Sequence, residues 1–288
     1  MAAIEFRNVS YTYLKSVKGA KKALDGIDIS IDGGITGLIG HTGCGKSTLV
    51  QMINGLLRPD EGQVLIDGVD IWKEPKKIGE IRFKAGLVMQ YPEYQLFEET
   101  VRKDIAYGPT RMRLSAEETE ARVRESAAIV GLSDTELDAS PFELSGGQKR
   151  RAAIAGILAM RPEVLVLDEP AAGLDPEGRD VIFSAVRRYK EEQGATVILV
   201  SHSMENLTEY CDRIAVLKKG KLELSGTREE IFSDPKVLRA SGLDVPEITV
   251  LAEELAERGL SLDRPVYSVG GAAEAVSVLL GKRKGGNA

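Results

Sequence analysis

The stretch of sequence that decides the fold is Gly40-His41-Thr42-Gly43-Cys44-Gly45-Lys46-Ser47-Thr48. From Gly40 to Ser47 it matches the pattern G-x-x-x-x-G-K-[ST]. The apolar residues Ile35–Ile39 precede it and predict a buried strand, and a helix is expected over residues 45–57. This pattern requires a strand that runs through a glycine-rich turn into a helix. The alternative, a chance glycine-rich turn, does not account for that context.

The chemistry of this stretch points to a triphosphate ligand. Glycines let consecutive backbone N–H groups surround an anion, and the start of a helix adds a partial positive charge. Lys46 is expected to reach the β- and γ-phosphates, and the Ser47 hydroxyl is expected to bind Mg²⁺. The sequence therefore predicts a phosphate-binding loop at residues 40–48.

A second candidate element is the acid pair Asp168-Glu169, which follows the apolar run of residues 164–167. Such a run predicts a strand covered on both faces, and its end places the two carboxylates at the edge of the sheet where ligands bind. Asp168 is a candidate for holding Mg²⁺ through water, and Glu169 for orienting and deprotonating an attacking water. Acids also follow buried strands without any function, so this interpretation depends on the phosphate loop upstream.

The third element is Leu144-Ser145-Gly146-Gly147-Gln148, which precedes an apolar helix. A Ser-Gly-Gly turn that opens a helix offers exposed N–H groups, a hydroxyl donor and the helix dipole to an anion. A plain helix cap is the alternative for this segment taken alone. One chain therefore carries two candidate phosphate-binding helix starts.

Around these motifs, strands alternate with helices. Strands are expected at residues 4–9, 23–31, 63–66, 86–89 and 196–200, with a hairpin over residues 214–224, and residues 100–160 are expected to be helical. The pattern predicts an α/β fold with a largely parallel sheet, preceded by antiparallel N-terminal strands. We expect a nucleotide-binding domain over residues 1–226, with a helical subdomain at about residues 100–160, and a small, mainly helical C-terminal region over residues 227–288.

Composition excludes several classes of protein. The chain has 288 residues and a net charge of −6, which argues against a mainly electrostatic nucleic-acid binder. The two cysteines, Cys44 and Cys211, have no metal-site or disulfide spacing. The longest apolar run, residues 152–160, is far shorter than the roughly eighteen residues that a membrane span needs. Neither a membrane span nor a signal peptide is expected.

Taken together, the motifs resemble those of the ATP-binding cassette family, whose signature sequence is LSGGQ. Gln90 resembles the family's glutamine that contacts magnesium and the attacking water. Asp175 resembles the aspartate that crosses the dimer interface, and His202 resembles the histidine that contacts the γ-phosphate. Tyr13 resembles the aromatic residue that stacks on adenine, and Tyr11 is the competing candidate.

This resemblance implies a P-loop ATPase core that hydrolyses ATP with Mg²⁺ as cofactor. Two cassettes would pack head to tail, with each ATP between the phosphate loop of one and the signature of the other. The implied catalytic residues are Glu169, His202 and Gln90, and the implied magnesium ligands are Ser47, Gln90 and Asp168. The implied nucleotide contacts are Tyr13, Gly40, His41, Thr42, Gly43, Cys44, Gly45, Lys46, Ser47, Thr48, Ser145, Gly146, Gly147, Gln148 and Asp175.

Two segments are similar to one group within the family. Residues 90–101 (QYPEYQLFEETV) resemble the corresponding segment of energy-coupling factor transporters, and residues 145–160 (SGGQKRRAAIAGILAM) are similar to the same group. Arg150-Arg151, after the signature, resembles the second of their two paralogous ATPases. The resemblance implies an ATPase that powers uptake of a vitamin or a transition-metal ion from the cytoplasmic face of the cell membrane. The implied partners are a paralogous ATPase or a second copy of this chain, a transmembrane coupling subunit and a substrate-capturing membrane protein. The alternative is a soluble assembly ATPase with no role in transport.

Overall fold

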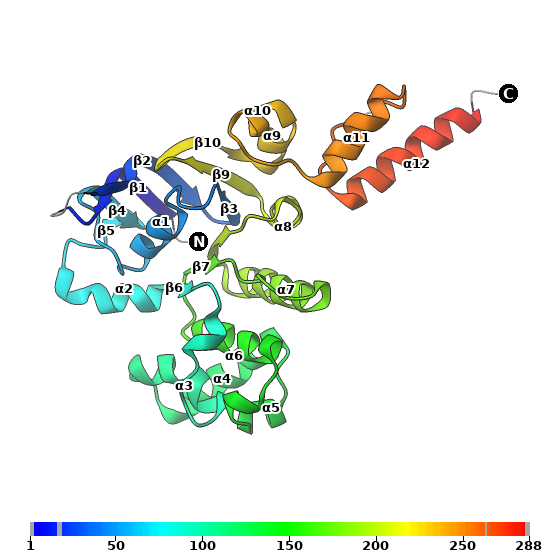
Figure 1. The fold of residues 1–288 in the computed structure, drawn as a ribbon. Coiled ribbons are helices and arrows are strands. Elements are labelled where there is room, and N and C mark those ends of the chain that lie inside the picture. The colour runs from blue at the N-terminus through cyan, green and yellow to red at the C-terminus, as the bar shows by residue number, and fades with distance from the viewer. Residues whose placement is uncertain (1–2, 16–18, 263, 286–288) are drawn as a thin grey trace.

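The computed structural model describes residues 3–15, 19–262 and 264–285. Its strands form two sheets (Figure 1). The antiparallel sheet has the strand order β2 (Lys21–Asp32), β1 (Ala3–Tyr13), β4 (Glu61–Ile66) and β5 (Val69–Asp70). The second sheet has the order β10 (Lys221–Thr227), β9 (Arg213–Lys218), β3 (Ile35–Ile39), β8 (Thr196–Val200), β7 (Val164–Asp168) and β6 (Ala85–Val88).

The second sheet confirms the predicted α/β fold. Strands β9, β3, β8, β7 and β6 are parallel to their neighbours, and only β10 pairs antiparallel, in the predicted hairpin with β9. Parallel strands that are covered on both faces need apolar residues at nearly every position. Strands β3, β6 and β8 are buried at every residue, in agreement with this requirement.

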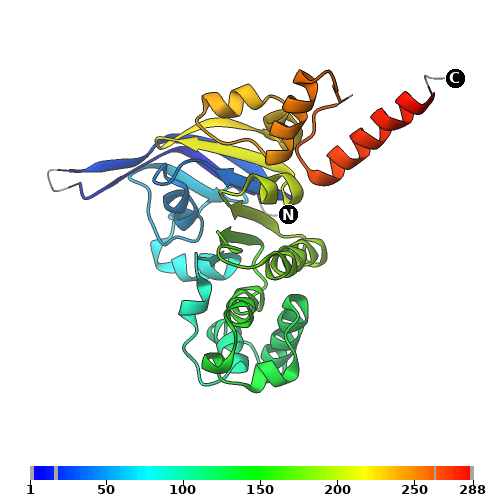
Figure 2. The same ribbon diagram turned by 45° about the vertical axis from the view of Figure 1, so that its right-hand side comes forward.

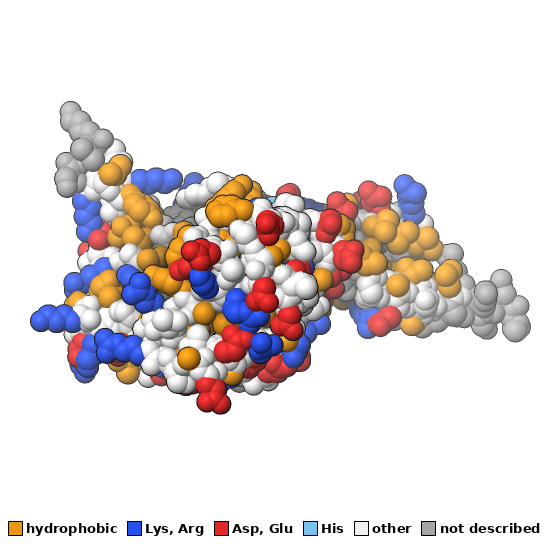
Figure 3. Space-filling view, turned by 90° about the horizontal axis from the view of Figure 1, so that it is seen from below, with side chains coloured by type: hydrophobic (Ala, Val, Ile, Leu, Met, Phe, Trp, Pro, Cys, Tyr) orange, Lys and Arg blue, Asp and Glu red, His pale blue; other side chains and the backbone are white. Residues whose placement is uncertain are grey.

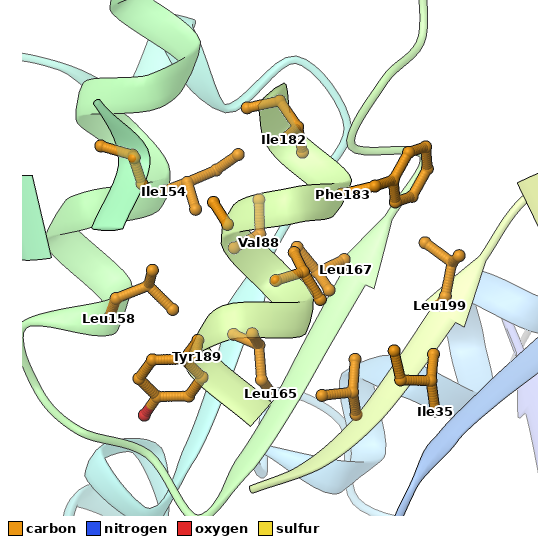
Figure 4. Close-up of a cluster of buried hydrophobic side chains, with 14 of the residues drawn as sticks. Ile35, Val88, Ile154, Leu158, Leu165, Leu167, Ile182, Phe183, Tyr189 and Leu199 are labelled. Atoms are coloured by element: carbon orange, nitrogen blue, oxygen red, sulfur yellow. The ribbon is translucent and has the colours of Figure 1, made fainter. Parts of the chain in front are cut away.

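Alternate residues of the central strands enter different cores. Leu165 and Leu167 of β7 pack on the side of helix α7 (Pro176–Gln193), together with Phe183 and Tyr189 (Figure 4). Residues 164 and 166 face the other way, toward helix α1 (Lys46–Ile53) and the antiparallel sheet. The phosphate loop and the carboxyl ends of β7 and β8 are therefore held between two packed layers.

Helix α1 is shorter than predicted. The expectation for residues 45–57 is wrong at its end, because α1 stops at Ile53 and Asn54 caps it. Gly55 then takes a positive φ of 67°, and the N–H groups of Leu56 and Leu57 turn back to the carbonyl of Gln51. The left-handed glycine ends the helix before the Arg58-Pro59 pair reaches it.

The helices of residues 100–160 lie below the sheets in Figure 1 and remain grouped in the turned view of Figure 2. The Ser115 side chain caps the longest of them by accepting from the N–H of Glu118, and Gly131 ends that helix with a φ of 71°. A short helix, α2 (Ile78–Lys84), leads from the antiparallel sheet into strand β6 of the second sheet. The remaining elements of this part are η1 (Pro75–Lys77), η2 (Pro92–Gln95), α3 (Val101–Arg111), α4 (Ala116–Val130), α5 (Asp134–Asp138), η3 (Pro141–Glu143) and α6 (Gly146–Leu158).

After β8 the chain forms α8 (Met204–Tyr210), which the sequence analysis did not predict, and then the β9–β10 hairpin. The C-terminal helices are α9 (Arg228–Phe232), α10 (Pro235–Ala240), α11 (Glu247–Glu257) and α12 (Val269–Gly285). Thr227 and Glu230 form a capping box at the start of α9. Across the described residues, no helix combines the length and the apolar character needed to cross a bilayer.

Candidate nucleotide site

The phosphate loop has a backbone that only glycine can form at two of its positions. Gly40 has a φ of 149°, and a Cβ there would lie 2.2 Å from the carbonyl oxygen of Leu217. Gly45 has a φ of 114°, and a Cβ there would lie 2.6 Å from the carbonyl oxygen of Ala23. These close approaches fix the turn between β3 and α1, so that α1 begins directly at Lys46.

The Lys46 ammonium lies across this loop. Its Nζ donates to the carbonyl oxygens of Gly40, at 2.5 Å, and of His41, at 3.3 Å. The cation is therefore held at the concave side of the turn, where phosphate oxygens can replace the two carbonyls as its partners.

The two acids occupy the carboxyl end of β7. Glu169 takes a φ of 52°, and its N–H donates to the carbonyl of Val200 at the end of β8, at 3.0 Å. This left-handed turn directs the Glu169 carboxylate toward His202, whose Nδ1 lies 2.7 Å from Oε1 of Glu169. A non-glycine residue in this conformation stores backbone strain, which is concentrated in proteins at functional sites.

Burial raises the pKa of both carboxyl groups. For Asp168, the rise is opposed by a hydrogen bond from Ser47 and by the Lys46 ammonium. For Glu169, it is opposed mainly by His202. The side chain of Glu169 is 14% exposed and that of His202 is 77% exposed, so the acid is sheltered while the histidine faces outward. A sheltered carboxylate with a raised pKa is suited to accept a proton.

A cavity of about 420 Å³ joins these groups. Its lining includes Gln90, which follows β6, the acid pair Asp168 and Glu169 at the end of β7, and His202 after β8. The predicted residues that line it are Tyr13, Thr42, Gly43, Gly45, Lys46, Ser47, Thr48, Gln90, Asp168, Glu169 and His202. Gly40, His41 and Cys44 lie in the same loop outside the lining, and the Cys44 side chain is buried.

Two residues of the lining were missed. Lys21 and Ala23 of β2 complete the cavity from the antiparallel sheet. The sequence carried one signal for Lys21, namely the basic charge of the loop before β2, but no pattern linked that loop to the phosphate loop. The link exists because Gly45 packs against the carbonyl of Ala23.

The two candidate tyrosines have different surroundings. Tyr13 lines the cavity, and its Oη lies 3.2 Å from Oγ1 of Thr48. Tyr11 is partly buried against the core around α1 and meets the Tyr13 ring edge to face, with 4.8 Å between centroids. The position of Tyr13 favours it over Tyr11 as the residue that faces an adenine.

The second candidate helix start lies apart from the cavity. Ser145 caps α6: its Oγ accepts from the N–H of Gln148 at 3.3 Å, and Oε1 of Gln148 accepts from the N–H of Ser145 at 2.8 Å. Asp175 caps α7 by accepting from the N–H of Gly178 at 2.7 Å. None of residues 145–148, nor Asp175, is among the described residues that line the cavity. Within one chain, the predicted site residues therefore form two separate groups.

A parallel sheet with a glycine-rich loop, a lysine and a serine at a helix start, and an acid pair at the end of another strand of that sheet define a P-loop nucleoside triphosphatase. Residues 24–172 match the family described as ABC transporter. The chain belongs to this family, and within it to the ATP-binding proteins of energy-coupling factor transporters.

The relatives that support this assignment match nearly the whole of both chains, and the structures match most of this chain. The energy-coupling factor transporter ATP-binding protein EcfA2 of Clostridium acetobutylicum is 48% identical over 98% of this chain and 99% of its own. EcfA2 of Caldanaerobacter subterraneus is 50% identical over 94% of this chain and 95% of its own. The structure of cbiO1 from Clostridium perfringens, described as part of the ABC transporter complex cbiONQ, matches with a TM-score of 0.74 and 37% identity over 87% of this chain and 98% of that chain. A dimeric post-hydrolysis state of the ATP-binding cassette MJ0796, bound to ADP and Pi, matches with a TM-score of 0.70 and 30% identity over 78% and 98%.

Proposed function

We propose that this chain is the ATP-hydrolysing subunit of an energy-coupling factor importer, which powers uptake of a vitamin or a transition-metal ion. The observation that carries the proposal is the division of the site residues. One cavity is lined by residues of the phosphate loop, the acid pair and His202, while the LSGGQ helix start lies outside it, with open space at the Cβ positions of Gly146 and Gly147. A site divided in this way is complete only when a second cassette supplies its signature.

In this proposal the cavity binds ATP. Lys46 holds the β- and γ-phosphates, Tyr13 stacks on the adenine, and His202 contacts the γ-phosphate. Glu169 accepts the proton of the attacking water, which its sheltered carboxylate and raised pKa support. The Glu169–His202 hydrogen bond orients the carboxylate toward the end of the phosphate chain.

The oxygen donors beside the phosphate loop fit Mg²⁺. The buried Asp168 carboxylate is hydrogen-bonded by the Ser47 hydroxyl, and Gln90 adds an amide oxygen to the same cavity. Mg²⁺ is bound by few protein oxygens together with waters and substrate phosphates, which matches this small donor set. The ion would neutralise the charge of the β- and γ-phosphates.

In the second half of the site, Ser145, Gly146, Gly147 and Gln148 contact the ATP of the neighbouring cassette, and Asp175 crosses the interface. The start of α6 supplies N–H groups and a dipole to the γ-phosphate. The dimeric MJ0796 cassette, bound to ADP and Pi, supports a paired arrangement. The partner is a paralogous ATPase or a second copy of this chain.

A groove among the lower helices is suited to a membrane subunit. It has a volume of about 290 Å³ and lies between η2, α3 and α6. Phe97 is 61% exposed there and meets Tyr107 edge to face at 5.1 Å. We propose that a helix of the transmembrane coupling subunit occupies this groove and thereby holds the chain at the cytoplasmic face of the membrane. The substrate-capturing membrane protein then joins through the coupling subunit.

We divide the chain at residue 226, with the nucleotide-binding domain before it, its helical subdomain over about residues 100–160, and the C-terminal region after it. Exposed hydrophobic side chains lie on the C-terminal helices, at the right of Figure 3. They include Leu251, which is 49% exposed, and Val278, which is 44% exposed. These apolar faces support a further contact between paired cassettes.

The proposal is tested by the state of the Glu169→Gln chain with Mg²⁺ and ATP. Light scattering is expected to show a dimer, with this chain alone or with its co-expressed paralogue, because the nucleotide is bound but not hydrolysed. A strictly monomeric sample in both cases contradicts the shared site. Gentle detergent extraction is then expected to recover integral membrane proteins with the chain, whereas soluble partners would favour the soluble assembly ATPase.

A further inference from the structure

Arg150 does not line the nucleotide cavity, but its side chain contacts several of the segments that do. Arg150 follows Gln148 by two positions in α6, and its side chain is only 4% exposed. A buried guanidinium is costly unless its N–H groups find acceptors. The partners of Arg150 therefore show what its burial achieves.

The first partner lies in the segment that carries Gln90. Nε and Nη2 of Arg150 donate to the two carboxylate oxygens of Glu93, at 3.0 and 2.6 Å. Although burial alone would raise it, hydrogen bonds from Arg150 hold the pKa of Glu93 below its ordinary value. The Arg150 guanidinium also lies 5.7 Å from the ring centroid of Tyr91. Arg150 thus binds the chain one and three residues after Gln90.

The other partners lie in the segment between Glu169 and Asp175. Nη1 of Arg150 donates to the carbonyl oxygens of Ala172, at 2.5 Å, and Pro170, at 3.4 Å. These carbonyls belong to the turn directly after the candidate general base. One side chain therefore joins the Gln90 segment, the acid-pair segment and the signature helix.

The two bound segments share a strained backbone. Tyr91, next to Gln90, has a φ of 54°, and Glu169 itself has a φ of 52°. Left-handed residues other than glycine persist only where their surroundings hold them. Arg150 contacts the chain at or just after each of these two residues. Its guanidinium is therefore placed to hold both left-handed backbone conformations.

We propose that Arg150 is a positioning residue that links the two ATP sites of the cassette pair through its contact with Glu93. Gln90 and Glu169 act on the ATP bound to this chain, whereas the start of α6 acts on the ATP of the partner. Because Arg150 holds all three segments, the position of the signature is tied to the position of the catalytic groups. Arg150 itself touches no nucleotide, and this inference rests on the proposed function.

The test compares Arg150→Lys, Glu93→Gln and the double variant with a matched control, Arg122→Lys. Arg122 in α4 is also mostly buried, with 13% exposure, and bonds to Glu118 and to the carbonyl of Met160. These contacts join helices of residues 100–160 only. The full chain is measured in its ATP-hydrolysing assembly for kcat, nucleotide dissociation constant and melting temperature.

Arg150→Lys is expected to lower kcat about 10- to 100-fold, the loss that follows small misplacement of catalytic groups. Nucleotide affinity is expected to stay within about twofold of the wild-type value, and the fall in melting temperature should not exceed that of Arg122→Lys. Since Arg150 acts through Glu93, the double variant should be no slower than the slower single variant.

Three outcomes overturn the inference. One is a wild-type kcat for Arg150→Lys. Another is a loss of kcat that the Arg122→Lys control shares in proportion to its loss of stability, and the third is independent, multiplying effects of the two substitutions. If the wild-type assembly hydrolyses ATP while any of these is found, the proposed function stands and only the role of Arg150 fails. If the wild-type assembly does not hydrolyse ATP, both fail.

Discussion

At Glu169, backbone strain, burial and charge act on one side chain. The positive φ turns the carboxylate away from the path of β7. Burial raises the pKa of this carboxyl group, and the hydrogen bond to His202 opposes part of that rise. An unstrained residue at this position would point elsewhere, so the strain serves the direction of the side chain. Substitution by the isosteric amide removes this carboxylate without changing the shape of the side chain, so it tests the proposed role of Glu169 as general base.

Glu169→Gln is expected to keep ATP binding and to lower hydrolysis on the order of 10²–10⁴-fold, because the amide cannot accept the proton of the attacking water. Single-turnover hydrolysis and equilibrium nucleotide binding measure the two quantities. The control is Glu163→Gln, which removes an acid just before β7, at the opposite end of the strand, where Glu163 pairs with Lys84. A Glu169→Gln rate within about twofold of wild type would exclude Glu169 as the general base.

Tyr13→Ala is expected to weaken ATP binding roughly 5- to 150-fold, since stacking of a base on an aromatic ring contributes about 1–3 kcal/mol. Its melting temperature should change little, because the ring lies in the cavity and is 39% exposed. Tyr11→Ala should do the reverse, lowering stability by removing a ring that packs against the core. Fluorescent-nucleotide titration measures the affinity and thermal melting measures the stability of each variant. Equal affinities of the two variants for nucleotide would exclude Tyr13 as the residue that stacks on the adenine.

Among the elements, the helix starts show that local sequence can predict a helix cap but not the function of the helix start. Ser115 and Ser145 cap α4 and α6 through the same hydrogen bond, from the N–H three residues on, at 3.1 and 3.3 Å. Both caps follow from local sequence. What distinguishes them is that the start of α6 carries two glycines, Gly146 and Gly147, where the space that a Cβ would occupy is open. A local pattern therefore predicts the helix, but its function comes from the motifs around it.

Ser115→Ala and Ser145→Ala are each expected to cost about 1 kcal/mol of stability through loss of the cap. In a chain of this length this corresponds to a fall of roughly 2–4 °C in melting temperature. Only Ser145→Ala should also lower ATP hydrolysis, because in the proposed dimer its hydroxyl contacts the partner's nucleotide. Melting curves and hydrolysis rates of the two variants, measured side by side, decide the matter. Equal hydrolysis rates for the two variants would mean that Ser145 serves only as a helix cap.

The limits of prediction also follow from distance along the chain. The phosphate loop, the acid pair and the buried strands could be predicted because each is a contiguous pattern. Lys21 in the cavity and the pairing of Arg150 with Glu93 could not, because these contacts join residues that are far apart in sequence and only the folded sheet order brings them together. Helix α8 was missed because it has only 7 residues, too few to show a helical repeat of apolar side chains that would distinguish it from a loop.

For the whole molecule, the important feature is that the signature lies outside the cavity, so that in the proposed function folding alone leaves the ATP site incomplete. The cavity and the signature are built on different parts of the chain, with the parallel sheet holding one and the lower helices holding the other (Figure 2). A residue at the signature can therefore be changed without disturbing the fold and still disable the assembly. This separation of stability from pairing can be measured at one glycine.

Gly147→Asp is expected to leave the chain as stable as the wild type, or slightly more stable. A Cβ at Gly147 would meet no heavy atom of the described chain within 4 Å, and an acid at the second position of a helix interacts favourably with the helix dipole. The same carboxylate would occupy the place of the partner's γ-phosphate and repel it. Dimer formation with Mg²⁺ and ATP, measured by light scattering in the Glu169→Gln background, should therefore be lost.

The matched control for this change is Gly79→Asp. Gly79 is also the second residue of a helix, α2, and an added Cβ there likewise meets no atom of the described residues within 4 Å. Both variants gain the same charge at the same helix position, so any general effect of an added acid is shared. Pairing is expected to survive in Gly79→Asp and to fail in Gly147→Asp. Pairing that survives in both would mean that the start of α6 does not face nucleotide, because a carboxylate and a γ-phosphate cannot share those N–H groups.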